Sequence, residues 1–123
     1  MANHNAKGWR RIIRAFGYSV QGFKSCYEHE EAFRLEVFVL IPLLPLALWL
    51  GDTPVERAML VGSLLMIPLV ELLNSAIETN VDRIGLEHHE LSGRAKDIAS
   101  AAVFLIIAFA LIIWGLILLP KWV

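Results

Sequence analysis

Ile98-Ala-Ser-Ala-Ala-Val-Phe-Leu-Ile-Ile-Ala-Phe-Ala-Leu-Ile-Ile-Trp-Gly-Leu-Ile-Leu-Leu119 is a run of twenty-two residues without a charge. A helix of about 20 apolar residues crosses the hydrocarbon core of a bilayer, so this run predicts a transmembrane helix. Over the whole chain of 123 residues, 57% are hydrophobic, whereas soluble domains have about 45–50%. We therefore expect an all-α membrane protein with a single integral-membrane domain, residues 1–123.

Two further apolar runs precede this one. Residues 37–50 contain Pro42 and Pro45, which a membrane helix tolerates, so we expect a kink in this helix and not a break. A second run extends from Ala58 to Val70 and continues on one helix face beyond it. The polar stretch that follows has Gly85 as a predicted helix end and Ser92 as a predicted N-cap. Transmembrane helices are expected over residues 33–50, 55–80 and 95–119.

The N-terminal segment has an amphipathic pattern. Large apolar residues from Trp9 to Tyr27 recur with the i, i+3, i+4, i+7 spacing of a helix, and basic residues lie between them. This pattern is typical of a helix that lies in the membrane interface and is attracted to anionic lipid, although packing on the chain's own core is compatible with it. We expect the interfacial helix over residues 7–28.

The distribution of charge predicts the topology. Of the eleven Lys and Arg residues, six precede residue 37 and three lie between residues 83 and 96. The positive-inside rule places both regions in the cytoplasm and the C-terminus outside. The net charge of −1 gives no indication of nucleic-acid binding, and Cys26, the sole cysteine, excludes an intrachain disulfide and is most simply a small apolar filler.

Residues 71–82 place acids and amides directly after an uncharged run. At 100° per residue, Glu71, Asn74, Ser75, Glu78 and Asp82 fall within an arc of roughly 100°, which makes them a polar stripe on one helix face. The stripe rises roughly 16 Å, so one end can lie in lipid and the other in water. Glu78 and Asp82 alone are compatible with ordinary interfacial residues, but Glu71 lies among apolar residues, where an acid usually marks function.

Paired acids near a basic residue such as Lys96 favour Mg²⁺ with a bound phosphate, because Mg²⁺ takes one or two carboxylates together with phosphate oxygens and water. The chain has neither the phosphate-binding loop G-x-x-x-x-G-K-[ST] nor the Gly-rich loop and D-F-G motif of protein kinases. Any nucleotide chemistry must therefore use a different kind of site. His88 and His89 lack the spacing and further ligands of a zinc site.

The stripe and its flanking motifs resemble a known family. Glu71-Leu-Leu-Asn74-Ser75-Ala-Ile-Glu78-Thr-Asn-Val-Asp82 is similar to the signature of the prokaryotic diacylglycerol kinases, E-x-[LIVM]-N-[ST]-[SA]-[LIV]-E-x-x-V-D, and matches it at every specified position. Other segments follow in the family's order and spacing: Arg11-Ile-Ile-Arg-Ala, Gly17-Tyr18-Ser19, Glu31-Ala-Phe-Arg34 with Glu36, Asp82-Arg-Ile-Gly85, and His89-Glu-Leu-Ser-Gly-Arg-Ala-Lys96-Asp97.

The resemblance implies an interfacial helix and three transmembrane helices that assemble as a homotrimer, with active sites shared between neighbouring protomers, in the bacterial inner membrane. It also implies an activity: a lipid kinase that transfers the γ-phosphoryl group of MgATP to the hydroxyl of diacylglycerol, giving phosphatidic acid and ADP. Its implied partners are diacylglycerol, ATP and the bilayer.

The resemblance also implies roles for individual residues. Glu71 matches the acid assigned as base for the lipid hydroxyl, and Glu30 and Glu78 match the acids that hold the metal with ATP. Glu31 beside Glu30 leaves open which of the two faces the metal, although the Ala-Phe-Arg that follows favours Glu30. The implied nucleotide-binding residues are Arg11, Tyr18, Glu30, Asn74, Glu78, Asp82, Glu87, His89, Lys96 and Asp97. The implied lipid-substrate residues are Glu71, Ser100, Glu36 and Arg34.

Three alternatives to a diacylglycerol kinase stay open at this level. The acceptor of the phosphoryl group could be a polyprenol such as undecaprenol, as in a related branch of the family. A small ion-coupled transporter would also place an acid such as Glu71 in a membrane helix. A non-catalytic interaction subunit would explain the hydrophobicity of the chain but not the acidic stripe.

Overall fold

The computed structural model describes residues 7–123, and the first six residues of the predicted domain lie outside the described residues. Four helices follow one another in the chain: α1 (Trp9–His29), α2 (Glu31–Leu50), α3 (Pro54–Ile84) and α4 (Glu90–Trp122). By length and composition, α2, α3 and α4 are each able to cross a membrane. The predicted class, an all-α chain with one amphipathic helix and three long apolar helices, is confirmed.

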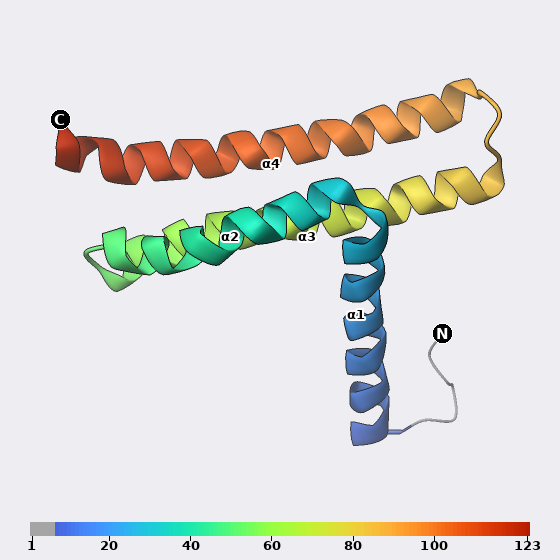
Figure 1. The fold of residues 1–123 in the computed structure, drawn as a ribbon, viewed down its shortest axis with the longest axis horizontal. Coiled ribbons are helices and arrows are strands. Elements are labelled where there is room, and N and C mark those ends of the chain that lie inside the picture. Colours follow the sequence, from blue (N-terminus) through green and yellow to red (C-terminus); the bar gives the residue numbers. More distant parts are fainter. Residues whose placement is uncertain (1–6) are drawn as a thin grey trace.

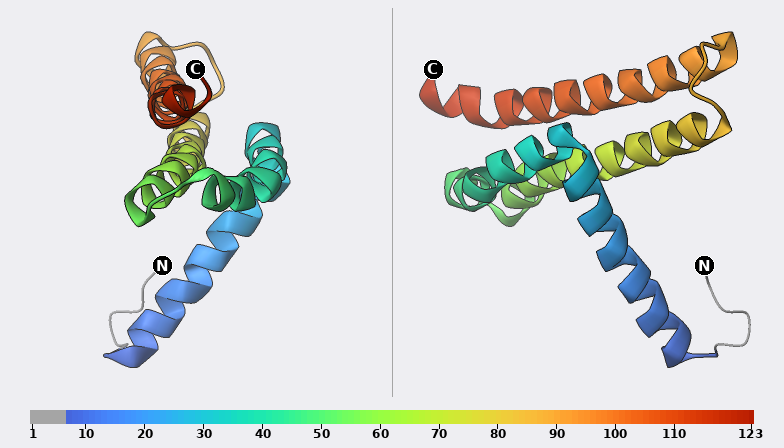
Figure 2. Two further views of the ribbon diagram at one scale, coloured as in Figure 1. Left: turned by 90° about the vertical axis from the view of Figure 1, so that its left-hand side faces the viewer. Right: turned by 45° about the vertical axis from the view of Figure 1, so that its right-hand side comes forward.

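The three apolar helices run alongside one another, and α1 leaves them at a steep angle (Figure 1). The two further views agree that α1 projects away from the other helices (Figure 2). α3 is central because it packs against both α2 and α4. The short turns after α2 and α3 reverse the chain each time. As a result the C-terminal half of α3, the start of α4 and the α1–α2 junction lie towards the same end of the bundle.

A small apolar core joins the helices at the opposite end. Leu40 and Ala47 from α2 are buried against Leu60 and Leu64 from α3. From α4, the Trp114 indole Nε1 donates a hydrogen bond to the Leu60 carbonyl at 3.3 Å. This bond satisfies the polar atom of a large side chain, as buried tryptophans require. The core thus fixes how the three long helices pack.

The turn between α2 and α3 is held by caps and ion pairs. Thr53 Oγ1 accepts from the Glu56 backbone N–H at 3.1 Å, with proline at the first helical position of α3. Lys121, near the end of α4, bonds Asp52 at 2.7 Å and also bonds the Glu56 carboxylate. The hydrogen bond from Lys121 holds the pKa of Asp52 below its ordinary value. The last turn of α4 is thereby tied to the α2–α3 turn.

The polar loop after α3 differs in one detail from the prediction. Gly85 is the C-cap of α3, as predicted. The N-cap of α4 is His89, whose Nδ1 accepts from the Leu91 N–H at 3.0 Å, and Ser92 lies inside the helix. The prediction of a Ser92 cap was therefore wrong, because a histidine ring nitrogen supplies the acceptor three residues earlier. α2 continues through Pro42 and Pro45 without a break.

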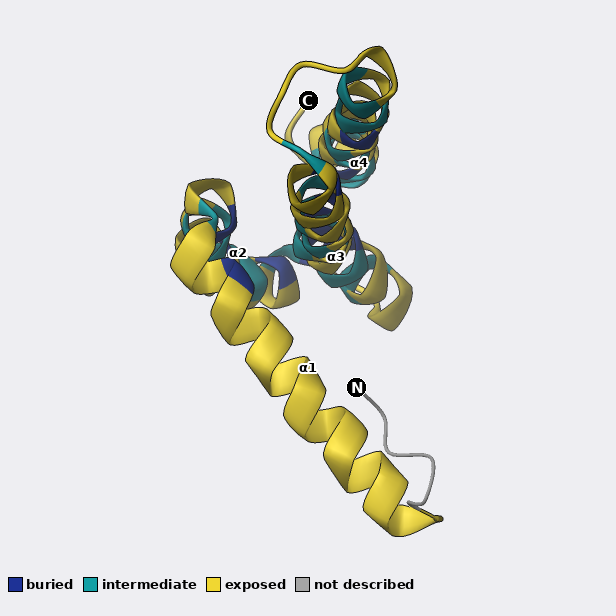
Figure 3. Cartoon of the chain, turned by 90° about the vertical axis from the view of Figure 1, so that its right-hand side faces the viewer, coloured by how far each residue is buried: buried dark blue, intermediate teal, exposed yellow. Residues whose placement is uncertain are grey.

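Most apolar surface is exposed in the single chain. α1 is exposed along almost its whole length, and only Cys26 within it is buried (Figure 3). Large side chains such as Trp49 and Phe104 are each 76% exposed. Contiguous exposed apolar surface of this kind marks contact with lipid or with another protein surface. The fold therefore requires an apolar environment around α2, α3 and α4.

Replacing Leu60 by alanine tests the core. Leu60 is fully buried, so Leu60→Ala is expected to lower the free energy of unfolding by about 2–5 kcal/mol. Unfolding with a denaturing detergent in mixed micelles measures it. The matched control is Leu105→Ala, since Leu105 is 70% exposed on α4. Equal losses in both variants would contradict the assigned core.

Candidate functional site

One amide joins the two acids of the polar stripe. Asn74 Nδ2 donates to Glu71 Oε1 at 3.3 Å and to Glu78 Oε1 at 3.2 Å. Glu71 is only 4% exposed and Asn74 only 9%, whereas Glu78 is half-buried. Because a buried carboxylate needs hydrogen-bond donors, Asn74 stabilises Glu71 within an apolar helix and orients both acids on the same face of α3.

A second segment reaches the stripe from the α1–α2 junction. Glu30 separates the two helices with an extended backbone conformation, φ −117° and ψ 109°. Its Oε1 accepts a hydrogen bond from Ser75 Oγ at 3.1 Å, across 45 residues of sequence. The negative charges of Glu30 and Glu78 both repel a negative charge on Glu71. The α1–α2 junction therefore adds a third carboxylate to the pair on α3.

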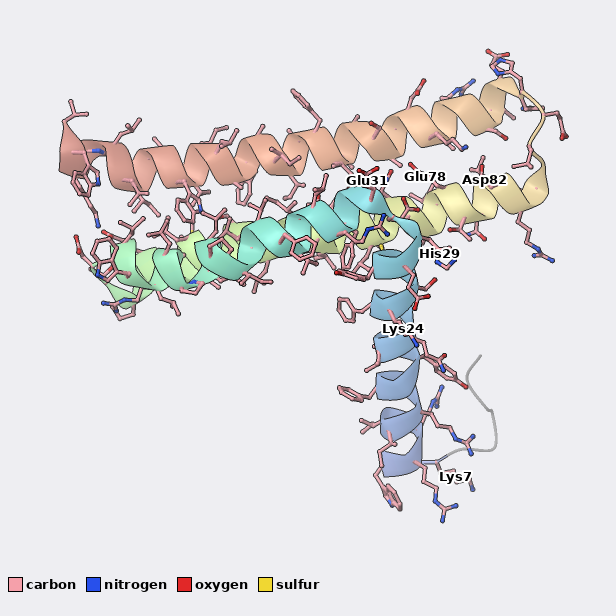
Figure 4. All side chains as sticks on the ribbon, in the orientation of Figure 1. Lys7, Lys24, His29, Glu31, Glu78 and Asp82 are labelled. Carbon is pink, nitrogen blue, oxygen red and sulfur yellow. The ribbon has the colours of Figure 1, made fainter. Side chains whose placement is uncertain are left out.

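Glu30 and Glu31 have different surroundings. Glu31 begins α2 and is exposed, while Glu30 is half-buried against Ser75. Figure 4 labels Glu31 near the α1–α2 junction, with Glu78 and Asp82 further along α3. Of the two neighbouring acids, Glu30 is the one with a hydrogen bond to the stripe.

A third segment meets the C-terminal end of the stripe. Lys96 Nζ from α4 forms an ion pair with Asp82 Oδ1 from α3 at 2.8 Å. Both side chains are about half exposed, 43% and 49% respectively. A cation held this close to the acids can neutralise an incoming phosphate. Asp97, the next residue, is exposed on α4.

The α3–α4 loop forms a pocket whose lining residues lie between Asp82 and Lys96 in the sequence. Its volume is about 260 Å³, and its lining residues are Ile84, Gly85, Glu87, His89, Leu91 and Ser92. Glu87 folds back so that its carboxylate overlies Gly85, where an added Cβ would lie 2.6 Å from Oε1. Two predicted nucleotide-binding residues, Glu87 and His89, thus lie in one pocket.

The predicted lipid-side residues are dispersed. Glu36 borders an apolar groove of about 250 Å³, formed with Leu35, Val39, Leu40, Leu43, Leu64, Ile67 and Ile107. The Oε2 atom of Glu36 is buried without a hydrogen-bond partner in the described chain. A negative charge on Glu36 is repelled by a negative charge on Glu71. Ser100 is exposed on α4. Arg34 Nη1 donates to the Tyr27 and Glu28 carbonyls at 2.8 and 3.0 Å, which satisfies the last turn of α1.

Two predicted nucleotide-binding residues lie far from the stripe in the single chain. Arg11 and Tyr18 are on α1, which projects away from α3, and Lys7 marks its far end in Figure 4. At ~1.5 Å per residue, Arg11 lies about 27 Å from the end of α1 at His29. One chain alone does not bring these two residues to Glu78.

The acids fit a magnesium ion that arrives with a nucleotide. Among residues 7–123, no three His, Cys, Asp or Glu side chains are grouped closely enough to hold a metal by themselves. Mg²⁺ needs only one or two carboxylates when phosphate oxygens and water complete its shell. Glu78 and Glu30 can supply these carboxylates. Asn74 Oδ1 is buried without a partner in the described chain, so it offers a further oxygen.

Sequence reasoning missed the contact of Ser75 with Glu30. Cys26, interpreted from the sequence as a small apolar filler, is buried beside it. Ser75 was placed on the stripe by its helical angle, but no role followed from that. The thiol of Cys26 is hydrogen-bonded to Ser75, and its pKa is raised mainly by burial. The helical angle placed Ser75 on the stripe, but no sequence pattern indicated Glu30 as its partner.

Comparison with known proteins places the chain among relatives of similar length. The family profile of prokaryotic diacylglycerol kinase matches residues 17–118. The chain is 48% identical to the diacylglycerol kinase of Haemophilus influenzae over 94% of its own length and 98% of the relative's. It is also 48% identical to that of Escherichia coli K12, over 96% of each chain, and 40% identical to that of Helicobacter pylori strain 26695, over 93% and 89%. The chain belongs to the prokaryotic diacylglycerol kinase family.

Proposed function

We propose that this diacylglycerol kinase moves the γ-phosphoryl group of MgATP to the hydroxyl of diacylglycerol at the site formed by Glu71, Asn74, Glu78 and Glu30. Membership of the family makes the chain an ATP-dependent phosphotransferase. The observation that carries the assignment of the site is the bridge from Asn74 to both Glu71 and Glu78. Glu71 lies about one helical turn before Asn74, and Glu78 lies about one turn after it.

The length of α3 supports the division between deep and shallow acids. Its 31 residues give a rod of about 45 Å, longer than a hydrocarbon core of about 30 Å. With Pro54 at one boundary, the other boundary lies about 20 residues further on, near Asn74. Glu71 then lies at the depth of the hydrocarbon core and Glu78 at the depth of water, so a lipid alcohol and a nucleotide reach the stripe from opposite sides.

Glu71 is the proposed general base. One of its oxygens accepts from Asn74, which leaves the other for the proton of the lipid hydroxyl. A base within hydrogen-bond reach of the attacking hydroxyl typically contributes 10²–10⁴-fold to the rate. Phosphoryl transfer otherwise depends mainly on positioning and charge neutralisation. The apolar groove beside Glu36 provides a path by which an acyl chain brings that hydroxyl to Glu71.

Glu78 and Glu30 are the proposed magnesium ligands, with Asn74 beside them. Bound Mg²⁺ supplies charge neutralisation on the phosphates. Lys96 is the proposed phosphate contact, released from Asp82 when the nucleotide binds, and Asp97, Glu87 and His89 contact the rest of the nucleotide. The Lys96–Asp82 pair keeps the ammonium at the shallow end of the stripe beforehand.

We infer a homotrimer in which α1 of one protomer completes the site of its neighbour. Arg11 and Tyr18 are distant from Glu78 within one chain, and the exposed apolar faces of the long helices require burial. A partner protomer satisfies both requirements. The positive-inside rule then places the N-terminal segment and the α3–α4 loop in the cytoplasm, where ATP is available, and the C-terminus outside.

A panel of lipid alcohols tests the proposed function. Purified protein in mixed micelles is given radiolabelled ATP, Mg²⁺ and either diacylglycerol or undecaprenol. Label is expected in phosphatidic acid, with little transfer to undecaprenol. Preferential labelling of undecaprenol would show that undecaprenol, and not diacylglycerol, is the acceptor. Absence of any labelled lipid, together with proton-coupled flux in liposomes, would favour a transporter.

Glu71→Gln is expected to lower the turnover number by about 10²–10⁴-fold, because the amide cannot accept the hydroxyl proton. The variant keeps the size and the Asn74 contact of the side chain, so its oligomeric state is expected to match that of the unaltered protein by size-exclusion chromatography. Near-normal turnover of Glu71→Gln would contradict the base assignment.

Glu78→Gln is expected to abolish transfer or to raise the Mg²⁺ concentration for half-maximal activity at least about tenfold, because a neutral amide binds Mg²⁺ more weakly than a carboxylate. Titrating activity against Mg²⁺ at saturating ATP measures the change. Glu56→Gln is the matched control, since Glu56 lies at the opposite end of α3. Unchanged Mg²⁺ dependence in Glu78→Gln would exclude it as a ligand.

Mixing two variants that each lack one proposed site residue tests the shared site. Arg11→Ala protein and Glu71→Gln protein are unfolded, mixed and refolded together. If α1 serves a neighbouring protomer, some mixed trimers regain sites with both native residues, so activity is expected to rise above that of either variant alone. Sites built within one chain would show no recovery at any mixing ratio.

A further inference from the structure

The side chain of Glu30 has no restraint from its own helices. Glu30 is the N-cap of α2, yet it makes no side-chain capping hydrogen bond. Its backbone N–H bonds the Cys26 carbonyl, which holds the main chain but leaves the carboxylate free to rotate. A metal ligand is useful only when its orientation is fixed, and groups outside the ligand set usually fix it. Some neighbour must therefore orient the Glu30 carboxylate.

Ser75 is that neighbour. Its hydroxyl donates to Glu30 Oε1 at 3.1 Å in a half-buried contact between α3 and the α1–α2 junction. A hydroxyl has a single proton to donate, and here the proton is directed at the carboxylate. Since Ser75 occupies Oε1, the other oxygen of Glu30 remains available for a metal ion.

Cys26, on α1, lies beside this contact. Its side chain is 6% exposed, and Ser75 is a hydrogen-bonding neighbour of its thiol.

We propose that Ser75 is a positioning residue that turns the Glu30 carboxylate towards the metal bound with ATP. Ser75 itself touches neither the metal nor a substrate in this role. The inference rests on the proposed function, since it assumes that Glu30 is a metal ligand. It adds a link between the α1–α2 junction and the stripe on α3.

The test measures metal binding directly in the full-length protein. Free Mn²⁺ is followed by electron paramagnetic resonance in mixed micelles with a non-hydrolysable ATP analogue, and activity is titrated against Mg²⁺ in parallel. Ser75→Ala is expected to weaken Mn²⁺ binding roughly ten- to hundredfold. At saturating Mg²⁺ its turnover recovers, and the KM for diacylglycerol is unchanged. Ser75→Thr keeps the hydroxyl and restores tight Mn²⁺ binding.

Thr79→Ala is the matched control, because the Thr79 hydroxyl donates only to the Ser75 carbonyl one turn away and is exposed. It is expected to bind Mn²⁺ as the unaltered protein does. Normal Mn²⁺ binding by Ser75→Ala would overturn the proposal, as would a loss of turnover that Mg²⁺ does not reverse.

Glu30→Gln separates this proposal from the assignment of the metal site. If Glu30→Gln weakens Mn²⁺ binding and Ser75→Ala does not, the metal role of Glu30 stands and the positioning role of Ser75 fails. If Glu30→Gln binds Mn²⁺ normally, the metal role itself fails and the role of Ser75 fails with it. Parallel weakening in Glu30→Gln and Ser75→Ala supports both.

Discussion

The hydrogen bonds of Asn74 are the constraint on which the site depends. Glu71 is almost fully buried on a helix that is long and apolar enough to cross a membrane, and an ionisable group there costs roughly 2.5–3.5 kcal/mol on insertion scales. A single amide nitrogen offers a donor to Glu71 and another to Glu78. These hydrogen bonds lower the cost of burying Glu71 and hold Glu78 on the same helix face. The remaining site elements meet the same helix face, through Ser75 for Glu30 and through Asp82 for Lys96.

The proposed site accounts for how a small membrane protein serves two substrates of opposite solubility. In that proposal a lipid alcohol approaches from the apolar side and a nucleotide from water, and the rise of α3 spans the boundary between them. Since phosphoryl transfer depends largely on positioning and charge neutralisation, the chain needs few chemical groups. It needs those groups at two depths, which a single helix with a polar stripe supplies. The core around Leu60 and the ion pairs of Lys121 lie at the other end, where they hold the helices together without entering the site.

The sequence predicted the features that follow from periodicity and length. The four helices, the stripe from Glu71 to Asp82 and the end of α3 at Gly85 all depend on local pattern. The cap at His89 was missed because histidine is not a usual capping residue, although its ring nitrogen accepts well. The Ser75–Glu30 contact was not predictable, because it joins residues 45 positions apart across a helix junction. The steep departure of α1 and the use of Arg34 to satisfy its last turn likewise depend on tertiary geometry.

The division of roles between the two acids bridged by Asn74 is the central claim, and equilibrium binding of MgATP to the two single variants tests it most directly. With isothermal titration calorimetry in mixed micelles, Glu71→Gln is predicted to bind MgATP as tightly as the unaltered protein, because its carboxylate serves the lipid hydroxyl. Glu78→Gln is predicted to bind MgATP at least about tenfold more weakly, since it loses a carboxylate from the magnesium site. Equal weakening in the two variants, or weakening in Glu71→Gln alone, would contradict the account.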